Sequence, residues 1–239
     1  MTAPRRIALL NPNSNPATTA AMLALARAAA PDGMILTGFT ADRTPPILTR
    51  PSDLEDAAEW VGSMLPGLVE AGFAAVLVAA FGDPGVDLHR ATSPIPLVGI
   101  AEAGMALAAH GGRRFAVVTT TPEFEAPIAA RAAALGLADR LATVRITPGD
   151  PLAVMGDEDR LERALIEVAV AAVTLDGAEA VLVGGGPLGP VAAALARRLS
   201  VPVIEPVAAG VAVVAERLGL ARRPDAAAPP AREPIDRTA

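Results

Sequence analysis

Apolar and polar positions divide the chain into short β-branched apolar runs and longer Ala-rich segments. The runs are continuously apolar, which is typical of parallel strands covered on both faces, and the segments between them favour helices. The predicted strands are residues 6–11, 34–40, 74–81, 96–100, 114–120, 142–147, 180–185 and 201–206. The predicted helices are residues 16–30, 52–71, 101–111, 122–136, 157–176, 188–198 and 206–218.

Three stretches of the first half recur in the second half, in the same order and at a nearly constant offset, which indicates an internal duplication. The matched segments are residues 6–13 with 114–121, 72–85 with 177–190, and 94–108 with 200–214. We therefore expect an α/β fold of two similar lobes, each with a parallel four-stranded sheet flanked by helices. The lobes should be related by a pseudo-two-fold axis, with a ligand crevice between them.

The duplication also predicts how the chain divides. Lobe 1 should comprise residues 1–100 plus 206–220, and lobe 2 residues 101–205. Residues 221–239, rich in Pro, Ala and charge, should form a flexible tail.

Loops after equivalent strands should approach one ligand from opposite sides, because ligands bind outside the carboxyl ends of parallel strands. The offset pairs Ala80 with Gly185, and residues 11–13 with residues 119–121. Such a crevice would offer small side chains, amides, hydroxyls and free backbone N–H groups. That environment suits a small carboxylate or a cyclic imide.

The composition is that of a folded globular protein, with 52% apolar and 19% charged residues. The net charge is −6, opposite charges are interspersed and only 3% of residues are aromatic, so we expect no nucleic-acid partner. The chain has no Cys and only two His, His89 and His110, which excludes disulfides and argues against a metal site. No apolar window reaches the length of about 18 residues typical of a membrane span, so we expect a soluble cytoplasmic protein with no membrane partner.

Five strings in register carry a family resemblance. They are LNPNSN (10–15), AAFGDPG (79–85), PLVGIAEA (96–103), RRFAVVTTT (113–121) and VPVIEPVAA (201–209). Together they resemble the Asp/Glu/hydantoin racemase superfamily, and the hydantoin racemases most of all, over residues 6–215. The resemblance implies a two-lobed α/β fold and proton chemistry, without a cofactor, at a carbon next to a carbonyl. It also implies two cysteines, one from each lobe: one removes the α-proton and the other returns a proton to the opposite face.

Both cysteine positions of the family pattern are occupied by other residues, because they fall on Ala80 and Gly185. Neither side chain can carry a proton. Three explanations stay open. Ala80 could be a Cys-to-Ala substitution that traps a ligand, or the chain could be naturally thiol-free, with Glu205 as the best replacement acid or base. The third is a binding protein without catalysis.

The predicted ligand contacts follow from the family pattern and from position in the crevice. They are Asn13, Ser14, Phe81, Gly82, Asp83, Thr119, Thr120, Gly186 and Pro187. Several of these residues also have a purely structural interpretation. Ser14 or Asn15 suits a helix N-cap. For Asp83 we favour a role in capping the following helix or stabilising the turn.

Four further polar residues are candidates of lower rank. His89 is interpreted as a surface or interlobe residue, and Glu102 and Glu205 as acids at helix N-termini. Arg43 could reach over the crevice toward a carboxylate.

The sequence thus predicts a racemase or isomerase that acts at the carbon α to a carbonyl of a small hydantoin-like or carboxylate substrate. The alternatives are a decarboxylase or lyase of the same superfamily and a non-catalytic small-molecule binding protein. We also expect a homo-oligomer, because many predicted helices have apolar faces.

Overall fold

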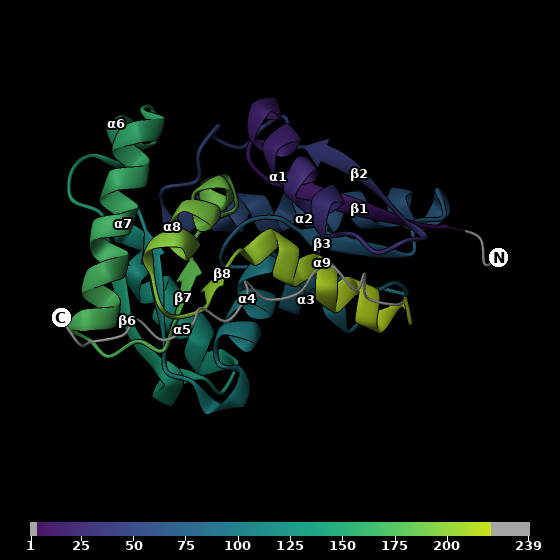
Figure 1. The fold of residues 1–239 in the computed structure, drawn as a ribbon. Coiled ribbons are helices and arrows are strands. Elements are labelled where there is room, and N and C mark those ends of the chain that lie inside the picture. Colours follow the sequence, from purple (N-terminus) through teal and green to yellow (C-terminus); the bar gives the residue numbers. More distant parts are fainter. Residues whose placement is uncertain (1–3, 221–239) are drawn as a thin grey trace.

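The computed structural model describes residues 4–220 and contains two four-stranded parallel sheets (Figure 1). The strands of the first sheet are β1 (Arg5–Asn11), β2 (Met34–Thr40), β3 (Ala75–Val78) and β4 (Leu97–Gly99). Those of the second are β5 (Phe115–Thr119), β6 (Leu141–Ile146), β7 (Ala180–Val183) and β8 (Val203–Ile204). Each predicted strand is present, and the predicted α/β class with two parallel four-stranded sheets is confirmed. The predicted tail, residues 221–239, lies outside the described residues.

The two sheets share one strand order. It is β2-β1-β3-β4 in the first sheet and β6-β5-β7-β8 in the second, so each strand has a counterpart at the same place. The duplication and the lobe boundaries stay predictions, and this shared order supports the duplication.

Helices connect the strands, as the sequence pattern predicts. They are α1 (Pro16–Ala29), α2 (Pro51–Glu70), α3 (Val86–Arg90), α4 (Ile100–Ala108), α5 (Glu125–Ala134), α6 (Pro151–Met155), α7 (Glu158–Thr174), α8 (Ala192–Arg198) and α9 (Pro206–Arg217). The short helix α6 was not predicted, and the helix expected directly after residues 79–85 is the short α3. The helix predicted from residue 188 begins as the 3₁₀ segment η4 (Gly186–Val191), because Pro190 has no N–H to donate to an α-helical hydrogen bond.

Two helices cross between the sheets. α4 follows β4 of the first sheet but packs against β7, and α9 follows β8 of the second sheet but packs against β3 and α1 (Figure 1). Each uses a glycine for close approach: a Cβ on Gly104 would lie 2.7 Å from Leu182 Cδ1, and one on Gly210 would lie 2.5 Å from Leu77 Cδ1. Each sheet is therefore packed against a helix that follows the last strand of the other sheet.

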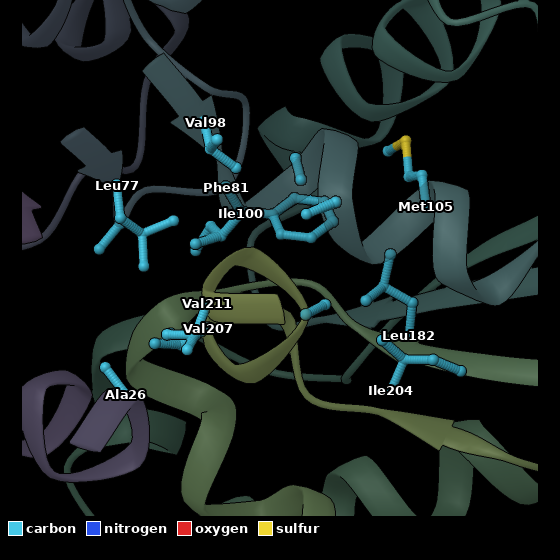
Figure 2. Packing of buried hydrophobic residues seen from close by; sticks show 14 of the residues in the cluster. Ala26, Leu77, Phe81, Val98, Ile100, Met105, Leu182, Ile204, Val207 and Val211 are labelled. Carbon is cyan, nitrogen blue, oxygen red and sulfur yellow. The ribbon is translucent and has the colours of Figure 1, made fainter. Parts of the chain in front are cut away.

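One hydrophobic cluster joins the two sheets. It contains Leu77 of β3, Leu182 of β7, Ile100 and Met105 of α4, and Val207 of α9, with other buried residues around them (Figure 2). The sheets therefore share a core, and the loops at their strand ends are held in fixed relative positions.

None of the helices in the described part of the chain is long and apolar enough to cross a membrane. The expected homo-oligomer stays a prediction.

Candidate active site

A cavity of about 60 Å³ lies where loops from the carboxyl ends of β1, β3, β5 and β7 meet. From the first half of the chain it is lined by Asn13, Ile47, Leu48, Leu54, Ala79, Ala80 and Phe81. From the second half it is lined by Thr119, Thr120, Thr121, Phe124, Met155, Gly184, Gly185, Gly186, Pro187 and Leu188. Corresponding loops of the two sheets thus face one space, which is the placement expected of a ligand site in parallel sheets.

The loops on the two sides are built alike. In the Ala80 loop (residues 79–85), the Ala79 N–H donates to the Leu10 carbonyl at 2.8 Å, and the Asp83 N–H donates to the Ala80 carbonyl at 3.1 Å. In the Gly185 loop (residues 184–190), the Gly184 and Leu188 N–H groups make the corresponding bonds, at 2.8 and 3.1 Å. Ala80 and Gly185 therefore occupy equivalent places in equivalent turns.

Most of the predicted ligand contacts line the cavity. These residues are Asn13, Ala80, Phe81, Thr119, Thr120, Gly185, Gly186 and Pro187. Three further residues predicted as contacts, Ser14, Gly82 and Asp83, lie outside the lining. Ser14 only precedes Asn15, the residue that caps α1 by accepting the N–H groups of Ala17 and Thr18.

The sequence reasoning missed the apolar wall of the cavity. Ile47 and Leu48 come from the segment between β2 and α2, and Leu54 comes from the first turn of α2. Phe124 and Met155 come from short helical turns. The only sequence signal was a pair of large apolar residues, Ile47 and Leu48, in a loop that is otherwise polar and Pro-rich.

Asn13 keeps its amide nitrogen available for a ligand. Its Oδ1 accepts the Asn11 side-chain amide at 2.8 Å and the Asn15 N–H at 3.0 Å. Its Nδ2 has no hydrogen-bond partner within residues 4–220, although the residue is only 7% exposed. Because a side-chain amide nitrogen carries two donors, Asn13 can donate into the cavity to a carbonyl oxygen.

The threonines on the opposite side divide into a structural one and two free ones. The Thr119 hydroxyl donates to the Gly184 carbonyl at 3.0 Å and so joins the ends of β5 and β7. The hydroxyls of Thr120 and Thr121 make no hydrogen bond to the described protein and line the cavity. A hydroxyl donates one hydrogen bond and accepts others, so these two suit both the oxygen and the N–H of a polar ligand.

The cavity lining contains no ionisable side chain among the described residues. Ala80 and Gly185 are the two positions at which the family pattern requires thiols, and the neighbouring lining residues do not replace them. The described chain also holds no group of three His, Asp or Glu side chains that could bind a metal ion. The site is therefore neutral, and the polar groups around it act as hydrogen-bond donors and acceptors.

Asp83 turns away from the cavity toward the crossing helix α4. Its Oδ1 accepts the Ala101 N–H at 2.8 Å, and its Oδ2 accepts the Glu102 N–H at 2.7 Å and Arg131 Nε at 3.0 Å. The sequence favours a role for Asp83 in capping the following helix or stabilising the turn. Asp83 does cap a helix, but that helix is α4 rather than α3, which follows Asp83 in the sequence. Burial raises the pKa of Asp83 to about 6, against the opposing effect of the Arg131 charge.

The raised pKa of Asp83 predicts a pH dependence of stability. The ordinary value is 3.8, so the folded chain binds this proton more tightly than the unfolded chain. The contribution of Asp83 to the free energy of unfolding therefore falls as the pH rises from 3.8, the ordinary pKa, to about 6, the pKa in the folded chain. We expect the stability of the chain relative to its Asp83→Asn variant to fall over that range in urea unfolding; a constant or rising difference would contradict the assignment.

The four lower-ranked candidates all lie outside the cavity lining. Glu205 caps α9 by accepting the N–H groups of Val207 and Ala208, so it is not placed to replace a missing acid or base. Glu102 accepts the Gly99 N–H at the start of α4, which confirms its N-terminal role.

Arg43 and His89 also lie elsewhere. The Arg43 side chain is 92% exposed beside Asp42. The imidazole of His89 packs over Gly62 of α2, so it lies within the first half of the chain rather than between the halves.

Comparison with known proteins agrees with this architecture. The family model described as Asp/Glu/Hydantoin racemase matches residues 7–214. A hydantoin racemase of Pseudomonas sp. (strain NS671) is 30% identical over 213 residues, covering 86% of this chain and 83% of that protein. A hydantoin racemase of Paenarthrobacter aurescens is 28% identical over 216 residues, covering 90% and 92%. The solved allantoin racemase from Klebsiella pneumoniae is 31% identical with a TM-score of 0.84, covering 92% of this chain and 90% of that one. The chain belongs to the Asp/Glu/hydantoin racemase family.

Proposed function

We propose that the chain is a cofactor-independent racemase or isomerase that acts at the carbon α to a carbonyl of a neutral, hydantoin-like substrate. Ala80 marks the place of the base. One observation carries the proposal: two equivalent loops face each other across a cavity whose described lining offers hydrogen-bond donors and no charged side chain. Inversion at a carbon needs a base on one face and an acid on the other, and loops from two sheets can supply both.

The neutrality of the cavity selects between the two substrate classes expected from the sequence. A buried carboxylate without a cationic partner carries a large desolvation penalty, whereas a neutral cyclic diamide needs only hydrogen bonds. The Asn13 amide and the hydroxyls of Thr120 and Thr121 can pair with ring carbonyls and ring N–H groups. The apolar wall, including Leu48 and Leu54, would hold an apolar substituent on the α-carbon.

The same donors would assist the chemistry. When the α-proton leaves, negative charge develops on the adjacent carbonyl oxygen, and fixed donors stabilise that enolate more than the ground state. The N–H groups of Ala80 and Phe81 have no acceptor within the described residues and are close to the reacting position. None of the described lining side chains can take the proton, so in the chain as it stands proton transfer relies on solvent and is slow.

A binding protein is the second candidate, and the absence of ionisable side chains from the described cavity lining favours it. A decarboxylase or lyase would need an anionic substrate, which this lining disfavours. The three functions differ in outcome: a lyase consumes its substrate, a racemase abolishes optical rotation, and a binder does neither.

The substrate class can be tested with a matched pair of ligands. The neutral ring 5-isobutylhydantoin and the ring-opened anion N-carbamoyl-leucine carry the same side chain. We expect calorimetry to give at least about tenfold tighter binding of the ring, since one desolvated and unpaired charge outweighs a hydrogen bond. Tighter binding of the anion would contradict the proposal.

Two variants locate the binding event. Asn13→Asp keeps the oxygen that accepts the loop hydrogen bonds but replaces the donating nitrogen, so we expect roughly tenfold weaker binding of the ring. Ser14→Ala changes the next residue, which lies outside the cavity lining, and should leave binding unchanged.

A further inference from the structure

The Ala80 loop contains an unusual backbone conformation. Asp83 has a φ of 53° and is the only residue other than glycine with positive φ in residues 4–220. Aspartate tolerates the left-handed region better than most residues, but the conformation still carries strain and persists only where surrounding contacts impose it. The contacts that do so here come from the Asp83 carboxylate.

The Asp83 carboxylate is fully buried against the start of α4. Its two oxygens accept the Ala101 and Glu102 N–H groups. Space for it is provided by Gly99, the last residue of β4, because a Cβ there would overlap the carboxylate carbon. The end of β4 is thus shaped around the Asp83 side chain.

In the second half of the chain, the start of the corresponding crossing helix, α9, is capped by a different kind of residue. At the start of α9, the N–H groups of Val207 and Ala208 are the counterparts of those of Ala101 and Glu102. They are capped by Glu205, the residue that directly precedes the helix. The residue that corresponds to Asp83 in the Gly185 loop is Leu188, which cannot cap. Only the Ala80 loop is therefore tied by a side chain to a crossing helix.

Arg131 extends this tie to the second half of the chain. It lies on α5, its side chain is 9% exposed, and its guanidinium bonds Asp83 and Glu102 at 3.0 and 3.1 Å and also bonds Asp87. Glu102 is held in addition by Arg90 at 2.5 Å. A buried ion pair adds little net stability, but removing one partner is strongly destabilising because it leaves an uncompensated buried charge.

We propose that Asp83 and Arg131 are positioning residues that hold the Ala80 loop against α4 and α5, and so fix position 80 across the cavity from Gly185. The inference rests on the proposed function, which makes position 80 the place of the base. It assigns these residues no contact with substrate. Among the described residues, the Gly185 loop has no corresponding side-chain bond to a crossing helix. Substituting Asp83 or Arg131 should therefore loosen the Ala80 loop and leave the Gly185 loop in place.

The test uses a reporter thiol and no substrate. The chain has no Cys, so Ala80→Cys introduces a single thiol at an 8% exposed position. Its alkylation rate by iodoacetamide reports how firmly the loop is held. In this background we expect Asp83→Asn and Arg131→Gln each to raise the rate about tenfold, because the loop opens more often. Arg131→Lys, which keeps the charge, should restore much of the protection.

The matched control is Glu205→Gln, also in the Ala80→Cys background. It weakens the corresponding cap at the start of α9, so it should lower thermal stability while leaving the alkylation rate within about twofold. The proposal would be overturned if Glu205→Gln raised the alkylation rate as much as Asp83→Asn does. It would also be overturned if Asp83→Asn or Arg131→Gln failed to raise that rate. Because the readout needs no ligand, it decides the matter even if the hydantoin assignment fails.

Discussion

Replacing Ala80 with Cys is expected to raise the rate of α-proton exchange in a 5-substituted hydantoin by about 10²–10⁴-fold over the chain as it stands. The reason is the missing base: the described cavity lining carries no ionisable side chain, and position 80 faces the cavity next to free N–H donors. An ordinary thiol has a pKa of about 8.5, so only a small fraction is thiolate near neutral pH, and hydrogen bonds from the free N–H groups favour that form. The thiolate can remove the proton while the donors stabilise the enolate.

Proton NMR in heavy water measures this exchange directly. Ala80→Ser is the matched control, because it adds a group of similar size that does not ionise near neutral pH. We expect the serine variant to stay as slow as the original chain. Equal rates for the serine and cysteine variants would show that the thiolate is not the active group, and the place of the base would then be wrong.

The second thiol position separates exchange from inversion. With a thiol at position 80 alone, the proton should return mostly to the face that it left, so exchange should outrun the loss of optical rotation. Adding Gly185→Cys supplies an acid on the other face and should bring the two rates together. A Cβ at Gly185 would lie 3.3 Å from Leu188 Cδ1, so Leu188 must shift only by a few tenths of an ångström.

Among substitutions that add a single methyl group at the site, Gly186→Ala should lower the free energy of unfolding the most. A Cβ there would overlap Sδ of Met22, a fully buried residue of α1, and would lie 3.1 Å from the Ala79 carbonyl oxygen of the opposite loop. Relieving the clash requires the two loops to move apart or the core to repack, so we expect a loss of about 1–3 kcal/mol in the free energy of unfolding. Ligand affinity should fall as well, because the cavity lies between those loops.

The neighbouring glycine provides the control for this effect. Gly185 has extended backbone with a φ of 171°, and its added Cβ would meet only the flexible Leu188 side chain. Gly185→Ala should therefore change the free energy of unfolding by less than about 1 kcal/mol in urea denaturation. Equal destabilisation by the two substitutions would mean that close contact between the loops is not what requires glycine at position 186.

The sequence predicts the fold well because the signal for parallel strands is strong and local. The buried run at 180–183 and the N-terminal strand both read as unbroken apolar segments, and turn residues bound them. The helix α6 escaped prediction because five residues are too few to show a helical period. The start of η4 differs from the prediction because Pro190 has no N–H to donate to an α-helical hydrogen bond.

The site is predicted where it follows from topology and missed where it depends on side-chain direction. Ala80 and Gly185 come from the duplicated pattern, since equivalent strand ends must meet the same ligand. The direction of Asp83 could not be seen, because its partners Glu102 and Arg131 are distant in the sequence. Part of the apolar wall was missed because Met155 belongs to α6, a short helix that the sequence pattern does not predict.

The central claim is that a neutral hydantoin-like ring binds with its α-carbon between position 80 and position 185. The most direct measurement is a crystal structure of the unmodified chain with one enantiomer of 5-isobutylhydantoin, which no thiol in this chain can invert. We expect the ring carbonyls against Asn13, Thr120 and Thr121, and the α-carbon between Ala80 and Gly185. A ligand bound outside this cavity, or with its α-carbon turned away from both positions, would contradict the claim.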